Sequence, residues 1–329
     1  MNLGRVAFIY CGGGYTAAYG VGFTRALLQK GIKPEFVQGI SAGALTAAKL
    51  VENNWDIEEL VKRWLRIQSL GQEAIFNRSK LAIAIHVFKS GLFSNQNLRR
   101  MTLDEINFRA IVKSPIEFQV VTQNKTTGLQ SVFSNRDSEI QAQPEILKQA
   151  TLASNSISGF FPPVFIKGEK HSDGDVMKIS EAVRAGCHTI FILNNSRVDS
   201  MGEGSKTETN WFSEAVAQMQ QLGNQLLIRK IEWAIERGYA LIQNNPSSFF
   251  EGMRPLQKIR RRINKFAGEL LEDVVAPRRI VLISPSEPIP TFNAIGFREA
   301  NPRTGYPGDI VKAIERAAND LNDEFWAKL

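Results

Sequence analysis

Short apolar runs that end in glycine-marked turns organise the first fifty residues. An apolar run at 5–11 stops at a glycine and predicts a buried strand. Helical spacing of apolar positions follows over 17–30 and ends at Gly31. A second short strand is expected at 36–40, followed at once by a helix of small residues at 42–51. This alternation of strand, turn and helix is typical of a parallel sheet built from βαβ units.

Strands and helices continue to alternate along the rest of the chain. Further strands are expected at 116–122, 129–133, 164–166, 187–193 and 279–283. Helices are expected across much of 56–110, with a loop near 93–97, and at 144–153, 211–275 and 310–329. The pattern predicts one α/β domain with a mainly parallel central sheet.

The composition changes after residue 200. A polar stretch rich in Gly, Ser and Thr at 201–210 predicts a linker, and the residues after it show an almost wholly helical pattern. We therefore expect an α/β core over 1–204, a helical insertion or cap over 205–278, and a strand and helix that return to the core over 279–329.

Composition and charge narrow the possible functions of the 329 residues. The chain is 43% hydrophobic and 22% charged, as expected of a globular protein. Its two cysteines, Cys11 and Cys187, cannot form a disulfide framework, and no Cys/His zinc motif is present. A formal net charge of +7 favours acidic partners, either phospholipid surfaces or nucleic acid.

The sequence contains no recognisable targeting segment. The apolar run near Met1 is too short for a secretory signal, and the longest later run, 81–88, is far shorter than the roughly 18 residues of a spanning helix. We therefore expect a cytoplasmic protein that can bind peripherally to a membrane.

Candidate chemistry begins with a G-x-S-x-G motif. Gly39, Ser41 and Gly43 lie between a predicted strand and a predicted helix, the setting in which this motif exposes a nucleophilic serine on a sharp turn. Side chains at the two glycines would collide with neighbouring backbone. The alternative is a serine that merely caps the N-terminus of a helix.

A run of glycines, Gly12, Gly13 and Gly14, ends the first predicted strand. Consecutive glycines expose backbone N–H groups that can converge on an anion. A phosphate cradle and an oxyanion hole are both consistent with this, but the fingerprints of phosphate-binding loops are missing. The nearby serine motif favours the oxyanion hole.

The general base is harder to assign. The chain has three histidines: His86 and His188 lie in apolar segments that predict core positions, and only His171 lies beside a candidate turn. Asp173 follows a predicted strand on a tight turn, and a carboxylate can replace an imidazole as the base. A Ser-Asp dyad therefore suits this chain better than a Ser-His-Asp triad.

These residues resemble the patatin-like phospholipases. Four blocks follow the order of that family: the glycine run with Ala18, Tyr19 and Gly22; Gly31 to Pro34 leading into the G-x-S-x-G motif; Ala153 and Ser154 with Phe161 to Val164; and Asp173 with Gly174. The match covers roughly residues 5–195, with a weaker echo at 280–285 and in the final helix, and leaves 205–278 without a counterpart.

The resemblance implies a three-layer α/β/α fold and a lipid acyl hydrolase without a cofactor. It implies that Ser41 is the nucleophile, that Asp173 is the base, and that the Gly12 to Gly14 segment supplies oxyanion donors. Calcium affects some members of the family.

Three positions depart from the family pattern. Thr16 and Ala17 stand where the family usually has a basic residue and then a glycine, and Asp175 replaces a Gly or Ala. Alanine is tolerated at 17 only if its φ is negative, and the lost basic residue removes a charge beside the developing oxyanion. Asp175 either points to solvent or raises the pKa of Asp173 by repulsion of like charges.

A basic segment at 254–266 is a candidate membrane contact. Its apolar residues recur at three- and four-residue steps, and its cations occupy the other faces: Arg254, Lys258, Arg260, Arg261, Arg262 and Lys265. Such a helix can lie on an anionic membrane surface, or simply pack its apolar stripe on the core. Nucleic-acid binding is not expected, since no recognition fold accompanies the charge.

Three functions remain open. The first is a lipid acyl hydrolase of phospholipase A or lysophospholipase type. The second is a lipid-binding or regulatory protein with weak or no turnover, and the third is a soluble short-chain carboxylesterase or thioesterase. The sequence makes no prediction of oligomeric state.

Overall fold

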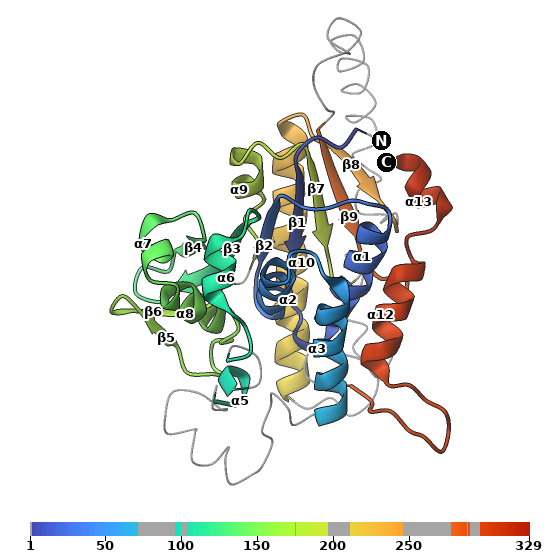
Figure 1. The fold of residues 1–329 in the computed structure, drawn as a ribbon, viewed down its shortest axis with the longest axis horizontal. Coiled ribbons are helices and arrows are strands. Elements are labelled where there is room, and N and C mark those ends of the chain that lie inside the picture. Colours follow the sequence, from blue (N-terminus) through green and yellow to red (C-terminus); the bar gives the residue numbers. More distant parts are fainter. Residues whose placement is uncertain are drawn as a thin grey trace, which may run out of the picture.

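The computed structural model describes residues 2–71, 96–100, 104–174, 176–196, 211–245, 278–287, 289 and 297–329 (Figure 1). Across these ranges the chain forms a nine-stranded sheet in the order β5-β6-β3-β2-β1-β7-β9-β8, with β4 beside β3. The strands are β1 (Val6–Tyr10), β2 (Phe36–Gly39), β3 (Glu117–Asn124), β4 (Gln130–Ser134), β5 (Val164–Ile166), β6 (Glu169–Asp173), β7 (Thr189–Leu193), β8 (Ala240–Gln243) and β9 (Arg279–Ile283).

The centre of the sheet is parallel. β1 pairs in parallel with β2 on one side and β7 on the other, and the parallel pairing continues through β3, β9 and β8. Only β4, β5 and β6 run antiparallel to their neighbours. All five residues of β1 are buried, as expected of a parallel strand covered on both faces.

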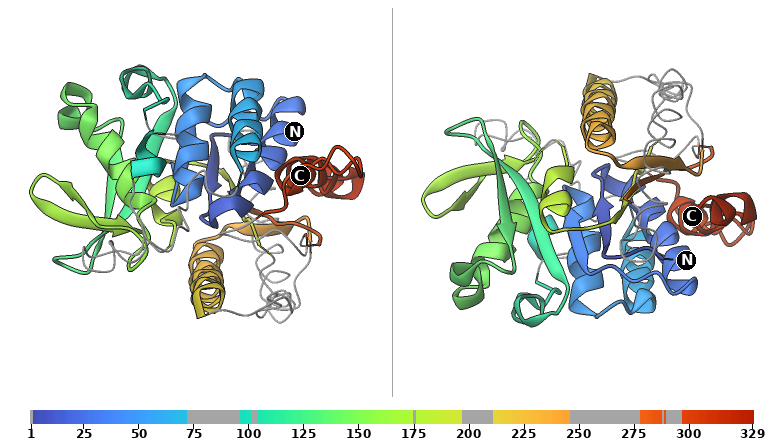
Figure 2. Two further views of the ribbon diagram at one scale, coloured as in Figure 1. Left: turned by 90° about the horizontal axis from the view of Figure 1, so that it is seen from below. Right: turned by 90° about the horizontal axis from the view of Figure 1, so that it is seen from above.

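Helices surround the sheet. They are η1 (Gly14–Ala17), α1 (Ala18–Gln29), α2 (Ala42–Glu52), α3 (Ile57–Leu70), α5 (Gln96–Leu98), α6 (Phe108–Lys113), α7 (Ser138–Ala142), α8 (Glu145–Ser154), α9 (Ile179–Arg184), α10 (Trp211–Glu236), α12 (Asp309–Asn319) and α13 (Asp323–Lys328). In Figure 2, α10 lies on the opposite side of the sheet from α2 and α3.

Two hydrophobic cores lie between the sheet and the helices, one on each face of the sheet. Because side chains alternate along a strand, Phe8 and Tyr10 of β1 join the core shared with α1, α2, α3 and α12. Ala7 and Ile9 join the other core, shared with α9 and α10. The predicted three-layer α/β/α fold with a mainly parallel sheet is confirmed.

Most predicted elements are found within one or two residues of their expected ends. Two helical predictions differ: α5 overlaps the loop expected near 93–97, and the single helix expected at 310–329 is divided into α12 and α13. Two strands differ as well. The stretch 211–275 was expected to be almost wholly helical, yet β8 lies within it and pairs with β9 in the central sheet. β6 was expected only as a turn around Asp173. The division into core, insertion and returning segment stays a prediction.

Within the described ranges, no helix combines the length and the hydrophobicity needed to cross a bilayer. The same ranges contain no group of three His, Cys, Asp or Glu side chains placed to hold a metal ion.

Candidate active site

Ser41 occupies a strained turn between β2 and α2. Its φ of 53° and ψ of −137° are unusual for a residue with a side chain. Ser41 is the N-cap residue of α2, but in the described structure its side chain makes no capping hydrogen bond. At the start of α3, by contrast, Asp56 accepts a hydrogen bond of 3.0 Å from the N–H of Glu58. The interpretation of Ser41 as an ordinary capping serine is therefore wrong.

The two glycines of the motif allow the backbone to pack closely around this turn. A Cβ atom at Gly39 would lie 2.4 Å from the Cα of Ala44, and one at Gly43 would lie 2.5 Å from the carbonyl oxygens of Tyr10 and Cys11. Both positions meet backbone atoms, which cannot move aside as a flexible side chain can. The sequence prediction that side chains would collide at these glycines is confirmed.

The glycine run lies directly against Ser41. A Cβ atom at Gly12 would come within 2.9 Å of the Cβ of Ser41. Gly13 and Gly14 adopt positive φ values of 141° and 56°. Among the described residues, the N–H groups of these three glycines have no hydrogen-bond acceptor. They are thus available to an anionic oxygen bound near Ser41.

Asp173 ends β6, and the pairing of β3 brings it close to Ser41. β2 pairs with the first half of β3, where Gly39 faces Val120, and β6 pairs with the second half, where Asp173 faces Thr122. Residues an even number apart in a strand direct their N–H groups to the same edge. The N–H of Glu117 donates to the residue before β2, and that of Lys125 donates to β6, so β2 and β6 share one edge of β3.

The two strand ends therefore meet along that edge. Their partners on β3 are two residues apart, a step of about 7 Å at the usual strand rise. Ser41 follows the end of β2 and Asp173 is the end of β6, and each is 8% exposed.

The end of α8 fills the gap between the two strand ends. Ser154 Oγ accepts a hydrogen bond of 2.9 Å from the N–H of Ser41 and donates one of 2.8 Å to the carbonyl of Val121. The carbonyl of Ser156 accepts a hydrogen bond of 3.0 Å from the N–H of Asp173. One short segment thus holds the backbone of both candidate catalytic residues, a role that the sequence did not reveal.

The described histidines take other positions. His171 is buried, its Nδ1 lies 3.0 Å from Thr122 Oγ1, and its ring packs edge-on against Phe133. Burial lowers the pKa of His171, which favours the neutral ring. His188 directly precedes β7, where the parallel strands begin, whereas Ser41 lies where they end. His86 lies outside the described residues.

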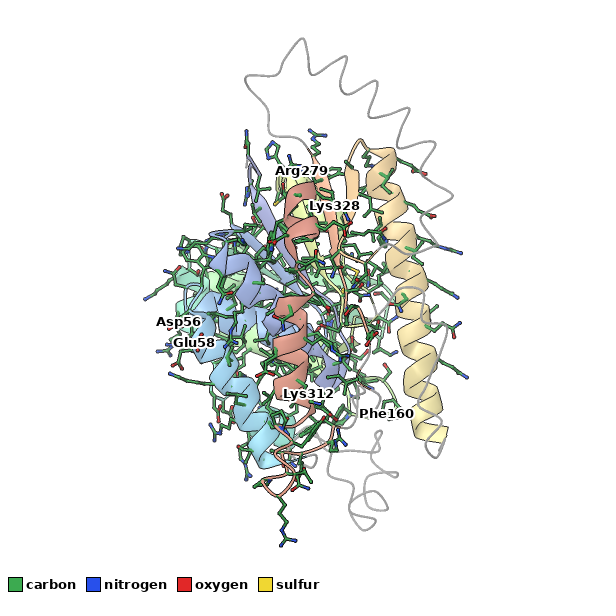
Figure 3. All side chains as sticks on the ribbon, turned by 90° about the vertical axis from the view of Figure 1, so that its right-hand side faces the viewer. Asp56, Glu58, Phe160, Arg279, Lys312 and Lys328 are labelled. Atoms are coloured by element: carbon green, nitrogen blue, oxygen red, sulfur yellow. The ribbon has the colours of Figure 1, made fainter. Side chains whose placement is uncertain are left out.

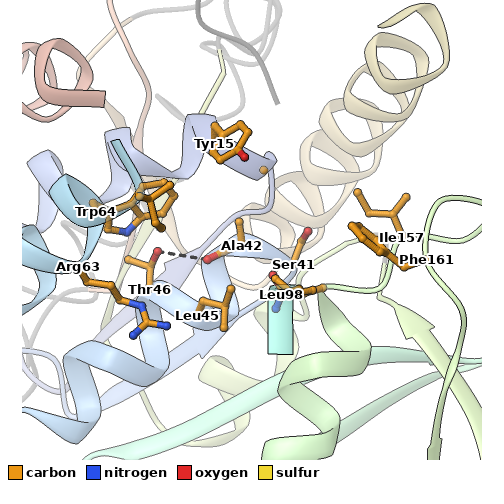
Figure 4. Close-up of a pocket in the computed structure, with 13 residues that line it drawn as sticks. Tyr15, Ser41, Ala42, Leu45, Thr46, Arg63, Trp64, Leu98, Ile157 and Phe161 are labelled. Atoms are coloured by element: carbon orange, nitrogen blue, oxygen red, sulfur yellow. Dashed lines mark hydrogen bonds between the residues drawn. The ribbon is translucent and has the colours of Figure 1, made fainter. Parts of the chain in front are cut away.

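A small apolar pocket opens beside Ser41 (Figure 4). Its cavity volume is about 40 Å³, and most of its lining side chains are apolar: Tyr15, Leu45, Trp64, Ile67, Leu98, Ile157 and Phe161. Ser41 and Ala42 form part of the wall, with Ile157 and Phe161 on one side and Trp64 on the other. Apolar side chains thus line the space next to the serine hydroxyl.

Comparison with known proteins identifies the family of the chain. A sequence model of the patatin-like phospholipases matches residues 9–198, which is more than half of the chain. The chain belongs to the patatin-like phospholipase family. This is a family of lipid acyl hydrolases, and the assignment confirms the resemblance inferred from the sequence blocks. No curated protein matches the chain.

Three solved structures show distant similarity to this chain. VipD from Legionella pneumophila is 12% identical with a TM-score of 0.44, and the match covers 99% of this chain and 67% of that one. Human GIVD cytosolic phospholipase A2, solved with methyl gamma-linolenyl fluorophosphonate, is 14% identical with a TM-score of 0.40, covering 76% and 46%. The type III effector ExoU is 14% identical with a TM-score of 0.29, covering 70% and 53%. The chain thus spans about half the length of the last two proteins.

The departures from the family pattern have different outcomes. Ala17 has a φ of −60°, so the alanine is accommodated without strain. The hydroxyl of Thr16 donates to the carbonyl of Gly13 at 2.7 Å. Asp175 and the basic segment 254–266 lie outside the described residues.

Proposed function

We propose that this protein is a serine hydrolase of lipid carboxylic esters that acts through Ser41 and Asp173. The observation that supports the proposal most directly is the pairing of β2 and β6 with neighbouring segments along one edge of β3, since it brings the ends of both strands together. The strained φ of Ser41 supports it further, as do the N–H groups of the glycine run, which have no acceptor in the part of the chain that the structure describes.

The proposed reaction has two stages. Ser41 Oγ attacks the ester carbonyl while Asp173 accepts its proton, and the carbonyl oxygen becomes an anion held by N–H groups of the Gly12 to Gly14 segment. The C–O bond of the ester then breaks, and the alcohol leaves with the proton from Asp173. Water, deprotonated by the same aspartate, attacks the acyl-enzyme and releases the acid, and Ser41 regains its proton.

Lipid esters fit this site better than small polar esters because the pocket beside Ser41 is lined mainly by apolar side chains. We therefore propose a phospholipid or lysophospholipid ester as the substrate, with the acyl chain in this pocket. Contact of residues 254–266 with an anionic membrane and a cytoplasmic location stay predictions.

Hydrolysis of p-nitrophenyl esters tests the proposal. A series from short to long acyl chains is measured with and without anionic liposomes, for the wild type, Ser41→Ala and Asp173→Asn. We expect turnover to rise with chain length, to fall about 10⁴-fold or more in Ser41→Ala, and to fall about 10³-fold in Asp173→Asn. Ser134→Ala is the matched control. Ser134 is equally buried, at 8% exposed, but it pairs with Gln119 in the first half of β3, away from the strand ends that carry Ser41 and Asp173.

Labelling with a fluorophosphonate probe separates the remaining functions. Labelling that is lost only in Ser41→Ala supports a serine hydrolase. An unlabelled wild type without turnover would instead indicate a lipid-binding protein on this fold. Preference for short chains and indifference to liposomes would indicate a soluble carboxylesterase or thioesterase.

A further inference from the structure

The carbonyl groups of the glycine run are fixed by two side chains from other parts of the fold. Asn195, just after β7, donates from Nδ2 to the carbonyls of Cys11 at 2.7 Å and Gly12 at 3.0 Å. Thr16 donates to the carbonyl of Gly13 twice, from Oγ1 at 2.7 Å and from its N–H at 3.1 Å. Three consecutive carbonyls are thus held in place.

Fixing a carbonyl also fixes the N–H group of the same peptide. In a planar trans peptide the C=O and N–H bonds point in opposite directions. The carbonyl of Gly12 shares its peptide with the N–H of Gly13, and the carbonyl of Gly13 shares its peptide with the N–H of Gly14. Hydrogen bonds from Asn195 and Thr16 therefore direct both N–H groups away from these two side chains.

We infer that Asn195 and Thr16 are positioning residues that orient the oxyanion donors of Gly13 and Gly14. This inference rests on the proposed function, because it assigns these residues to the same reaction. Their role is indirect: they act on the backbone of the glycine run.

Packing around Gly13 supports this assignment. A Cβ atom there would lie 2.5 Å from Thr16 Oγ1 and 3.4 Å from the Cβ of Asn195. Both side chains therefore contact the Cα of Gly13 closely, and its φ of 141° is one that glycine adopts readily. Rotation of the peptides on either side of Gly13 would require one of these side chains to move.

The amide of Asn195 is satisfied on one side only. Asn195 is 5% exposed, and its Oδ1 has no hydrogen-bond partner among the described residues. The two carbonyls need a donor, so Nδ2 must face them and Oδ1 must point away. A buried acceptor without a partner is destabilising. Only this orientation of the amide lets Nδ2 donate to both carbonyls.

The hydrogen bond of Thr16 indicates what this departure from the family pattern does. The family usually has a basic residue at this position, which places a charge near the oxyanion. Thr16 supplies no charge and instead ties down the carbonyl of Gly13. In this chain the position contributes through backbone geometry.

Kinetics of Asn195→Leu and Thr16→Val test the inference. Both variants remove the donor while nearly keeping the shape of the side chain. We expect kcat for a p-nitrophenyl ester to fall about 10-fold in each, less than the loss of a donor itself, with KM nearly unchanged. A trifluoromethyl ketone inhibitor forms an adduct with Ser41 that carries the oxyanion. Its affinity for both variants should fall by the same factor as kcat. Thr16→Ser should recover most of the kcat.

Two control variants remove hydrogen bonds that other buried Asn and Thr side chains donate to carbonyl groups. Asn194→Leu removes a donor to the carbonyl of Ser196, and Thr189→Val removes a donor to the carbonyl of Leu3. Both should keep kcat within about two-fold of the wild type. Melting temperatures of all variants show whether a lost activity reflects unfolding.

The outcomes distinguish this inference from the proposed function. A wild type without Ser41-dependent turnover contradicts the proposed function, and the inference with it. Ser41-dependent turnover that survives in both Asn195→Leu and Thr16→Val overturns the inference alone, as does a rise in KM at constant kcat. Should Asn195→Leu fail to fold, the comparison of Thr16→Val with Thr16→Ser decides.

Discussion

The parallel strands of the central sheet begin along one border, the amino edge, and end along the opposite border, the carboxyl edge. These two borders are built from different kinds of residue. At the amino edge, where Arg279 begins β9 (Figure 3), long side chains cover the ends of the strands. Arg5 forms an ion pair with Glu117 at 3.0 Å and donates to the carbonyl of Ala185 at 2.7 Å. Tyr239 Oη donates to the carbonyl of Cys187 at 2.8 Å.

At the carboxyl edge, small residues allow the backbone itself to come close. A Cβ atom at Gly174 would lie 2.7 Å from the carbonyl oxygen of Val121, and Gly43 is equally confined by the end of β1. Ser154 and Asn195 then fix backbone groups of Ser41 and of the glycine run.

This difference indicates how each edge should respond to mutation. The Arg5 side chain at the amino edge is 37% exposed and can adjust, so a substitution of Arg5 should change stability modestly. Backbone contacts at the carboxyl edge have no such freedom, so a single added methyl group should disturb both stability and turnover.

The largest effect is expected from adding a methyl group to a glycine. In Gly43→Ala the new Cβ would lie 2.5 Å from two carbonyl oxygens, so the end of β1 must shift. We expect a loss of about 3 kcal/mol in the free energy of unfolding, together with most of the turnover. Gly31→Ala is the comparison at the amino edge: its φ is +75° but nothing lies within 4 Å, so it should cost only about 1 kcal/mol and leave turnover intact. Urea unfolding and ester hydrolysis measure both, and equal effects of the two variants would contradict the comparison.

A smaller effect is expected from removing one hydroxyl at the end of α8. Ser154→Ala leaves the N–H of Ser41 and the carbonyl of Val121 without their partner, so we expect a loss of about 1–3 kcal/mol and about 10-fold in kcat. Ser156→Ala removes an equally buried hydroxyl that bonds only to the carbonyl of Leu152, and it keeps the backbone bond to Asp173. It should therefore lower stability without changing kcat. A similar kcat in the two variants would show that Ser154 does not position Ser41.

The smallest effect concerns pH. Burial holds the pKa of His171 below its ordinary value of 6.5, so below that pH the unfolded chain binds a proton that the folded chain does not. Stability should therefore fall as the pH decreases below about 6.5, by at most about 1.4 kcal/mol per pH unit, and level off below the folded pKa. In His171→Gln this part of the pH dependence should be absent.

Urea midpoints at about pH 7.5 and about pH 5.5 measure the effect. His188→Gln, at the amino edge, is the control that leaves His171 in place. Identical pH dependence of the wild type and His171→Gln would show that the buried ring does not titrate with unfolding.

Local sequence signals predicted the centre of the fold well. Strand β1 is wholly apolar, and β7 and β9 are apolar after their first residue; such runs identify buried parallel strands without knowledge of their partners. β6 carries no such signal, because its sequence Glu-Lys-His-Ser-Asp is polar and its burial comes from pairing with β3 and β5. β8 has only four residues and follows a long helical pattern that masks it.

The candidate site divides in the same way. Ser41 and its flanking glycines were predicted because the requirements of the turn are local. The roles of Ser154 and Asn195 were not predicted, because their partners are distant in sequence. Ser154 bonds to a residue 113 positions away, and Asn195 bonds to one 183 positions away. A short polar side chain at the end of an element gives no sign of which backbone group it will meet.

The sequence distance across the site has a consequence for folding kinetics. Gly12 and Asn195 meet only after β7 has docked beside β1, and closing a loop of that length is entropically costly. Local helices and the early βα units can form before it closes. Refolding chains should thus regain helical circular dichroism first and esterase turnover last, which makes turnover a reporter of the final docking step.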